Sequence, residues 1–176
     1  EFASSHIPGS IFLGHGEQIL QWAALLGDAD RALLLVCHEQ DEKVVVTNLA
    51  QVGFNNVRGF LKGTFDAWDK SFLIHDKVEL FSAAHFFNEK SSGYELIDVR
   101  RKNEFQNGHV PGARFMTLAE LSKGLHLLDK NKKYCIYCAG GFRSMIAASM
   151  LQRAGIRQVA SIVGGYAEIE KVKLVS

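Results

Sequence analysis

The sequence predicts an α/β protein with two doubly wound parallel sheets flanked by helices, and the first sheet is incomplete at its N-terminal end. Three observations predict this fold: short apolar segments alternate with helical ones, the same landmarks occur twice, and the composition is that of a globular chain. Of the 176 residues, 47% are hydrophobic and 22% are charged. These values exclude a mainly disordered or collagen-like chain, and the length suits one domain or two small ones.

An internal repeat divides the chain. Matching landmarks recur at offsets of 101 to 103 residues and in the same order: residues 1–10 and 104–113, residues 34–37 and 135–138, residues 52–54 and 154–156, and Gly63 and Gly165. A nearly constant offset indicates two copies of one unit. We therefore expect a truncated domain at residues 1–75 and a complete one at residues 76–176.

The two copies differ in how they begin. The second has 33 residues, 76–108, ahead of its His-Val-Pro-Gly segment, whereas the first has five residues ahead of the corresponding His-Ile-Pro-Gly. About 28 residues, including a buried strand, are thus missing from the first copy, and losing a buried strand leaves neighbouring backbone groups unpaired. We expect the chain to be a piece of a longer parent protein.

The first half of the second copy predicts two strands and a helix. Residues 78–81 form a short apolar strand, and Ser82 is an N-cap for a helix over residues 82–89. Residues 96–99, Leu-Ile-Asp-Val, then predict a buried strand. Strands that alternate with helices are typical of a parallel sheet.

The second half continues the alternation. Thr117 and Glu120 have capping-box spacing, which predicts a helix over residues 117–122. An apolar strand follows at residues 134–137, and a helix over residues 144–154 begins at Ser144 as its N-cap and ends at Gly155. Residues 159–163 form the last strand. Ligands of such sheets bind at the carboxyl ends of the strands.

Charge and cysteine usage exclude several classes of protein. The first 75 residues carry 5 basic and 9 acidic side chains, a net charge of −4, and the remaining residues carry 15 and 10, a net charge of +5. The basic residues are too scattered to predict nucleic-acid binding. No apolar run could span a membrane and no signal peptide is present, so we expect a cytoplasmic protein. Three cysteines are too few for a disulfide framework and favour reduced thiols.

The segment after the strand at residues 134–137 carries the candidate chemistry. Cys138 lies between a parallel strand and a helix N-terminus, where the helix dipole and backbone N–H groups favour a nucleophilic thiolate. Gly140 and Gly141 let the loop curl so that several amides converge on an anion. Arg143 adds a permanent cation that can bind an anion through two nitrogens.

Four motifs carry a family resemblance. They stand at residues 96–100 (LIDVR), 108–113 (GHVPGA), 137–144 (YCAGGFRS) and 163–166 (VGGY). In order and spacing they resemble the signature of the rhodanese-domain family over essentially all of residues 76–176. The first copy resembles a catalytically degenerate rhodanese unit, with residues 57–63 in place of the final Gly-Gly motif, so the two sheets are expected to be rhodanese-like.

The resemblance implies a sulfurtransferase. Cys138 would take sulfane sulfur from a small anionic donor, thiosulfate or a low-molecular-weight persulfide, and pass it to a thiol or another thiophilic acceptor. The implied substrate-binding residues are Ala139, Gly140, Gly141, Phe142, Arg143 and Ser144. Their backbone N–H groups would stabilise the sulfur, and Arg143 would orient the donor. No metal and no cofactor are expected.

The resemblance also has a wider context and two alternatives. Similar tandem units occur behind a metallo-β-lactamase-like domain, which is the partner domain we expect in the parent chain. A non-enzymatic alternative is a sulfur-carrier or regulatory module of a larger sulfide-metabolising protein. A Cys-dependent phosphatase is less favoured, because such enzymes place five residues between Cys and Arg and four intervene here.

Other candidate residues have structural interpretations. Cys135 and Cys138 form a Cys-x-x-Cys pair, but Cys135 lies inside a strand and is interpreted as a core thiol. Cys37 matches Cys138 in the first copy, but the acidic residues that follow it would repel an anionic donor and raise the pKa of its thiol. His109 is expected to be a hydrogen-bonded turn residue. Asp98 and Arg100 are expected to hold the strand end and to pair with neighbours such as Glu104.

Overall fold

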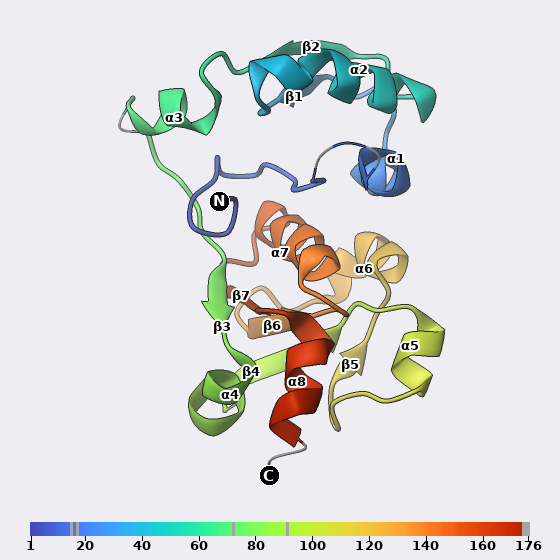
Figure 1. Ribbon diagram of the computed structural model, residues 1–176, viewed down its shortest axis with the longest axis vertical. Helices are drawn as coiled ribbons and strands as arrows, with labels where there is room; N and C mark the ends of the chain where they lie inside the picture. The colour runs from blue at the N-terminus through green and yellow to red at the C-terminus, as the bar shows by residue number, and fades with distance from the viewer. Residues whose placement is uncertain (15, 17, 72, 91, 174–176) are drawn as a thin grey trace. The chain divides into compact units, whose positions relative to one another are not determined.

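A computed structural model describes residues 1–14, 16, 18–71, 73–90 and 92–173 (Figure 1). The chain divides into two compact units. The small unit comprises Phe12–His75, and the large unit comprises Glu1–Ile11 and Asp76–Ser176. Both contain a parallel sheet with helices, which is the predicted α/β class.

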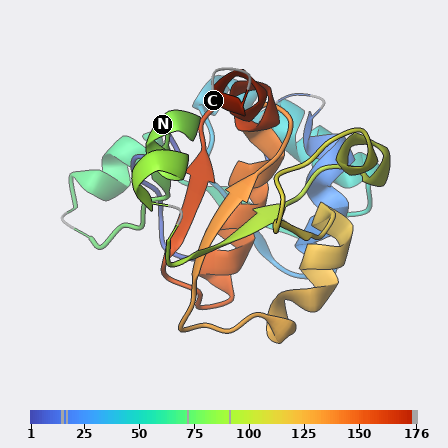
Figure 2. The same ribbon diagram turned by 90° about the horizontal axis from the view of Figure 1, so that it is seen from below.

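The large unit is built on a five-stranded sheet in the order β3-β7-β6-β4-β5. Its strands are β3 (Glu79–Phe81), β4 (Tyr94–Asp98), β5 (Arg114–Phe115), β6 (Lys133–Tyr137) and β7 (Val159–Ile162). All four neighbouring pairs are parallel, and Figure 2 shows the strands side by side. The predicted strands at residues 78–81, 96–99, 134–137 and 159–163 are confirmed to within two residues at each end.

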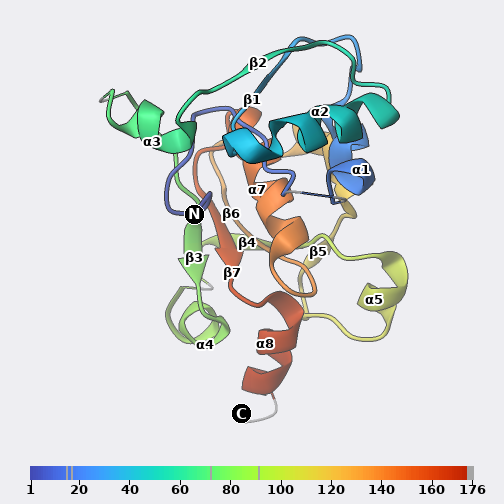
Figure 3. The same ribbon diagram turned by 45° about the horizontal axis from the view of Figure 1, so that its top comes forward.

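Helices cover both faces of this sheet. They are α4 (Ala83–His85), which continues into a π-helical turn (Phe86–Lys90), α5 (Lys102–Gln106), α6 (Leu118–Gly124), a 3-10 turn (Leu125–Leu127), α7 (Phe142–Arg153) and α8 (Gly165–Lys173). Helices α6 and α7 lie on one face, and α4 and α8 lie on the other (Figures 1 and 3). Among the described residues, no helix has both the length and the apolar character needed to cross a membrane.

The helix caps predicted at Ser82, Thr117 and Gly155 are present. The Ser82 side chain accepts a hydrogen bond from the His85 backbone N–H at 3.2 Å. The Glu120 N–H donates to Thr117 Oγ1 at 3.3 Å, and the Thr117 N–H donates to Glu120 Oε2 at 2.8 Å, so the capping box is closed. Gly155 follows α7 with φ of 92°, a left-handed conformation that ends the helix.

The small unit is a smaller version of the same architecture. Its parallel strands are β1 (Leu33–Leu35) and β2 (Val57–Phe60), and its helices are α1 (Gln18–Trp22), a 3-10 turn (Ala23–Leu26), a second 3-10 turn (Glu39–Asp41), α2 (Glu42–Gln51) and α3 (Thr64–Asp69). Figure 3 shows α1 beside α2. Ile19, Leu49 and Phe54 form its buried core, whereas the Leu34 side chain on β1 is 79% exposed.

Two turns repeat in atomic detail between the copies. The His6 ring stacks on Phe2 with centroids 4.0 Å apart, and His6 Nδ1 lies 2.9 Å from the Phe2 carbonyl oxygen. His109 stacks on Phe105 at 3.8 Å, and its Nδ1 lies 3.1 Å from the Phe105 carbonyl oxygen. The interpretation of His109 as a hydrogen-bonded turn residue is confirmed.

Residues 1–11 group with the second copy, a placement that differs from the predicted division of the chain. His6 and Asp76 exchange two backbone hydrogen bonds of 2.9 Å, and the Val78 N–H donates to the Ala3 carbonyl at 2.8 Å. His6 Nε2 also lies 3.1 Å from Gln152 Oε1 on α7. These contacts join residues 1–11 to Asp76–Ser176 within the large unit.

Candidate functional site

Cys138 is the first residue after β6, at the carboxyl end of the sheet. Strand β6 is buried along nearly its whole length, and its last residue, Tyr137, accepts a hydrogen bond from the Val99 N–H at 3.0 Å. The position follows from the parallel topology, which gathers the carboxyl ends of neighbouring strands at one edge. Only 1% of the Cys138 surface is exposed.

Helix α8 holds the carbonyl side of the loop. The Tyr166 N–H donates to the Cys138 carbonyl at 2.7 Å, and the Ala167 N–H donates to the Ala139 carbonyl at 3.2 Å. Gly165 precedes these donors with φ of 60°, and a Cβ there would collide with both carbonyl oxygens. Gly165 of the Gly-Gly motif therefore lets the start of α8 approach the backbone carbonyls of Cys138 and Ala139, and a residue with a Cβ would prevent this close approach.

The amide side of the loop turns toward the sulfur. Gly141 has φ of 101°, and its N–H donates to Cys138 Sγ at 3.1 Å. This left-handed residue is the N-cap of α7, which begins at Phe142. The prediction of Ser144 as the N-cap is therefore wrong, because the turn at Gly141 starts the helix earlier. Gly140, the middle of the loop, is exposed.

Ser144 lies on the inner side of the sulfur instead. Its Oγ is 3.7 Å from Cys138 Sγ and donates to the Gly141 carbonyl at 2.9 Å. The Ser161 hydroxyl, on β7, donates to Ser144 Oγ at 2.9 Å. Ser144 and Ser161 are both buried. Sequence reasoning missed Ser161; the available signal was one hydroxyl within the otherwise apolar strand Val-Ala-Ser-Ile.

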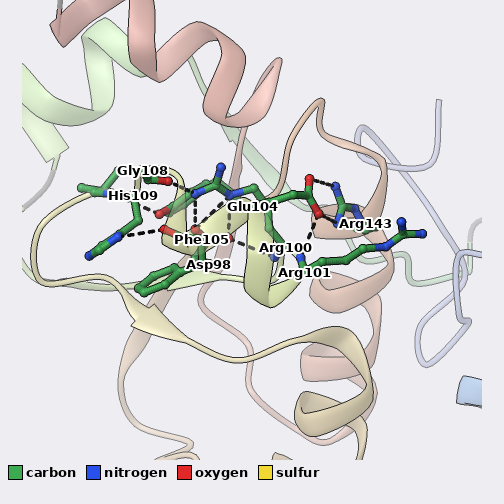
Figure 4. Close-up of polar contacts among 10 residues, drawn as sticks. Asp98, Arg100, Arg101, Glu104, Phe105, Gly108, His109 and Arg143 are labelled. Atoms are coloured by element: carbon green, nitrogen blue, oxygen red, sulfur yellow. Dashed lines mark hydrogen bonds and ion pairs between the residues drawn. The ribbon is translucent and has the colours of Figure 1, made fainter.

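Arg143 is bound by an internal carboxylate, as Figure 4 shows. Its Nη1 and Nη2 atoms donate to the two Glu104 oxygens at 2.6 and 2.7 Å. The hydrogen bonds with Arg143 lower the pKa of Glu104 from 4.5 to about 2, and the same contact raises the pKa of Arg143. The sequence named Glu104 as a pairing residue but did not indicate that its partner is Arg143. The donor-binding role of Arg143 stays a prediction.

Asp98 and Arg100 hold the end of β4, as expected. Arg100 Nε and Nη2 donate to the Asp98 carboxylate at 2.8 to 3.1 Å, and Nη2 also donates to the Gly108 carbonyl at 2.6 Å (Figure 4). The guanidinium stacks over the Tyr166 ring at 3.8 Å. The expected pairing of Arg100 with Glu104 is electrostatic only, since both Glu104 oxygens accept from Arg143 and Arg100 adds a smaller lowering of the pKa of Glu104.

The other two cysteines have different surroundings. Cys135 is fully buried in the core, and burial raises the pKa of its thiol far above the ordinary value. The interpretation of Cys135 as a core thiol is confirmed. Burial, and then Asp41 and Glu42, raise the pKa of Cys37. The described part of the chain contains no group of three or more His, Cys, Asp or Glu residues that could hold a metal.

Comparisons with curated proteins find relatives, some of which are named as sulfurtransferases. The chain is 36% identical over 81 residues to the uncharacterized protein YqhL of Bacillus subtilis, a match that covers 44% of this chain and 64% of that protein. It is 30% identical over 71 residues to the thiosulfate sulfurtransferase GlpE of Coxiella burnetii, covering 40% and 66%. The chain thus spans less than two thirds of either relative.

Solved structures support the fold. A rhodanese-related protein from Thermoplasma volcanium matches with a TM-score of 0.50 and 26% identity, covering 53% of this chain and 92% of that one. The reduced CoADR-RHD protein of Bacillus anthracis matches with a TM-score of 0.51 and 30% identity, covering 56% and 17%. Neither match indicates a metallo-β-lactamase-like partner domain, and that expectation stays a prediction.

The family model agrees with the internal repeat. The model described as "Rhodanese-like domain" matches residues 1–71 and again residues 83–171. These two segments cover most of the chain and correspond to the two copies. On these matches, the chain belongs to the rhodanese-like domain family.

Proposed function

We propose that this chain is a rhodanese-type sulfurtransferase whose second copy carries sulfane sulfur on Cys138. The observation that supports this most directly is the 3.1 Å hydrogen bond from the Gly141 N–H to Cys138 Sγ. The sulfur lies at the start of α7, a helix of 12 residues, where the positive end of the dipole stabilises a negative charge. A thiolate there can attack without a general base.

The first half-reaction loads the enzyme. The Cys138 thiolate attacks the outer sulfur of thiosulfate, a Cys138 S–S bond forms, the S–S bond of the donor breaks, and sulfite leaves with that electron pair. With a low-molecular-weight persulfide as donor, the leaving group is its thiolate. The Gly141 N–H donates into the region where the charged sulfur lies.

The second half-reaction unloads it. An acceptor thiolate attacks the outer sulfur of the Cys138 persulfide, takes that sulfur, and leaves the Cys138 thiolate for another cycle. The sulfur keeps its oxidation level throughout, so the cycle requires no external oxidant or reductant. These steps use the side chain and the loop of the second copy alone.

Arg143 contributes a positive charge to the site, although both of its Nη atoms already donate hydrogen bonds to Glu104. Its guanidinium remains close enough to Cys138 to interact with it electrostatically. We infer that the Arg143–Glu104 ion pair lines one side of the space beside Cys138 Sγ. The positive charge of Arg143 would still attract an anionic donor. In the first copy the six residues after Cys37 contain no arginine and include the acidic residues Glu39, Asp41 and Glu42.

The loading test uses intact mass. After incubation with thiosulfate or glutathione persulfide, we expect the wild-type protein to gain the mass of one sulfur atom, and we expect C138S not to gain it. C37S is the matched control, since Cys37 holds the corresponding position in the first copy, and it should load normally. Absence of the gain in the wild-type protein with both donors would reject the proposal.

A turnover test separates the alternatives. Many rounds of transfer from donor to acceptor thiol indicate an enzyme, whereas one sulfur per chain without turnover indicates a carrier. One relative supports the carrier alternative. The Bacillus subtilis protein YrkF, whose name designates a sulfur carrier, is 30% identical to this chain over 77 residues. Release of phosphate from an aryl phosphate, lost in C138S, would indicate a phosphatase instead.

A further inference from the structure

The buried pair Ser144 and Ser161 forms a chain of hydroxyls that ends at the candidate nucleophile. Ser161 Oγ donates to Ser144 Oγ at 2.9 Å, and Ser144 Oγ lies 3.7 Å from Cys138 Sγ. The two serines come from β7 and α7, 17 residues apart in sequence. Both are at most 1% exposed, so bulk water does not replace one partner when the other moves.

Ser144 has a single hydroxyl hydrogen and two acceptors within reach. In the arrangement with a neutral thiol the hydrogen points to the Gly141 carbonyl at 2.9 Å, which leaves Oγ to accept from the Cys138 thiol. A thiolate or a persulfide anion cannot donate, and it accepts most strongly from a nearby O–H. The favourable arrangement with a charged sulfur has the Ser144 hydrogen turned to that sulfur.

Rotation of the Ser144 hydroxyl toward the sulfur leaves no backbone group unpaired. The Gly141 carbonyl also accepts from the Met145 N–H at 3.3 Å, so it retains a partner when Ser144 rotates. Ser161 donates to Ser144 Oγ in both orientations, and an O–H that itself accepts a hydrogen bond is a stronger donor. Ser161 thus holds the oxygen in place while the hydrogen changes acceptor.

We propose that Ser161 is a positioning residue that orients the Ser144 hydroxyl toward Cys138 Sγ when the sulfur is negatively charged. This inference deepens the proposed function. The part of it that concerns the Cys138 persulfide rests on that proposed function. Arg143 of α7 interacts electrostatically with Cys138 and forms an ion pair with Glu104 of α5, and the proposal leaves that ion pair unchanged. Ser161 itself touches neither donor nor acceptor.

The first measurement is the rate at which iodoacetamide alkylates Cys138 near neutral pH, followed by peptide mass spectrometry. We expect S161A to slow alkylation by about three- to tenfold, the size of one hydrogen bond of roughly 1 kcal/mol. Cys37 in the small unit is an internal reference whose rate should not change. S149A is the matched control, because Ser149 is also buried on α7 and donates to the Ile146 carbonyl at 2.7 Å.

A double-mutant cycle tests whether Ser161 acts through Ser144. If it does, S161A causes no further slowing in an S144A background. Additive effects in the cycle, or an S161A rate equal to that of the wild type, would overturn the inference. S161T retains the hydroxyl and should restore part of the rate, and urea unfolding of each variant shows that the rates are compared between folded proteins.

The persulfide provides the second measurement. In S161A we expect an acceptor thiol to take the extra sulfur from loaded Cys138 about three- to tenfold more slowly than in the wild type, because Cys138 Sγ leaves as a thiolate in that step and lacks the same hydrogen bond. Alkylation does not depend on sulfur transfer. If the wild type never loads sulfur and S161A still slows alkylation, the proposed function fails and the positioning role stands. If the wild type loads normally and S161A leaves alkylation unchanged, the positioning role fails and the proposed function stands.

Discussion

At the scale of single residues, two cysteines in equivalent positions of the two copies have different surroundings. Cys138 and Cys37 each follow a parallel strand, but Cys138 Sγ accepts the Gly141 N–H at 3.1 Å. Burial and the carboxylates of Asp41 and Glu42 raise the pKa of Cys37. The side chain is the same in both copies, so the surrounding donors and charges decide which thiol is useful.

The Glu104–Arg143 ion pair leads to a prediction about pH. We expect E104Q to lower the free energy of unfolding by about 1 to 2 kcal/mol near neutral pH, since it leaves a partly buried guanidinium without its carboxylate. Because the pKa of Glu104 is lowered from 4.5 to about 2, its contribution is complete above pH 4.5 and disappears as the pH falls to about 2.

Urea unfolding of the wild type and E104Q at several pH values measures this. The difference between them should narrow as the pH falls below about 4.5. E168Q is the control, because the Lys171–Glu168 pair is much more exposed and its loss should cost no more than about 1 kcal/mol. A difference that stays constant down to pH 3 would contradict the prediction.

At the scale of elements, the candidate site is a loop held between two helices. Helix α7 supplies the amide end at Gly141, and helix α8 supplies two N–H donors to the carbonyls of Cys138 and Ala139. The predicted pattern of strand, loop and helix accounts for the first helix only. The second appears at the site because β7 lies beside β6 in the sheet.

The contact with α8 predicts unequal effects of two glycine substitutions. G165A places a Cβ against the carbonyl oxygens of Cys138 and Ala139 at a positive φ, and we expect a loss of stability of about 2 kcal/mol or more and loss of sulfur loading. At Gly140, an added Cβ meets nothing within 4 Å. The free energy of unfolding of G140A is therefore expected to lie within about 1 kcal/mol of the wild-type value.

Thermal and urea unfolding, with intact-mass loading alongside, measure both variants. If G165A proved as stable as G140A, the loop would not depend on the close approach of α8. Reduced loading in G140A without a change in stability would instead show a direct role of Gly140 in binding the donor.

At the scale of the whole molecule, the two units differ in the size of their sheets and in how deeply the strand side chains are buried. The large unit has a five-stranded sheet, whereas the small unit has two strands. On β6 the side chains of Tyr134–Tyr137 are buried, while on β1 the Leu34 side chain is 79% exposed. A two-stranded sheet with an exposed face has few contacts that oppose local opening.

Amide hydrogen exchange should reveal this difference. We expect the β1 and β2 amides to exchange faster than those of β4, β6 and β7, because the small unit opens at a lower free energy than the large unit. Exchange followed by peptide mass spectrometry resolves the two sets. Equal protection of β1 and β6 would mean that the two units open together.

The sequence alone determined the repeat, most strand positions and the helix caps at Ser82 and Thr117, and it indicated Cys138 as the candidate nucleophile. These features depend on neighbours within a few residues, such as a capping spacing or an apolar run followed by a glycine-containing loop. The same local signals placed Ser144 as an N-cap, which the left-handed turn at Gly141 overrides.

The tertiary structure decided the partners of these groups. Glu104 and Arg143 are 39 residues apart, Ser144 and Ser161 are 17 apart, and His6 and Gln152 are 146 apart. Such pairs leave no periodic or capping signal, because the sheet order and the packing of helices on it bring them together. The sequence therefore indicates the candidate thiol, and the fold decides which side chains hold the groups around it.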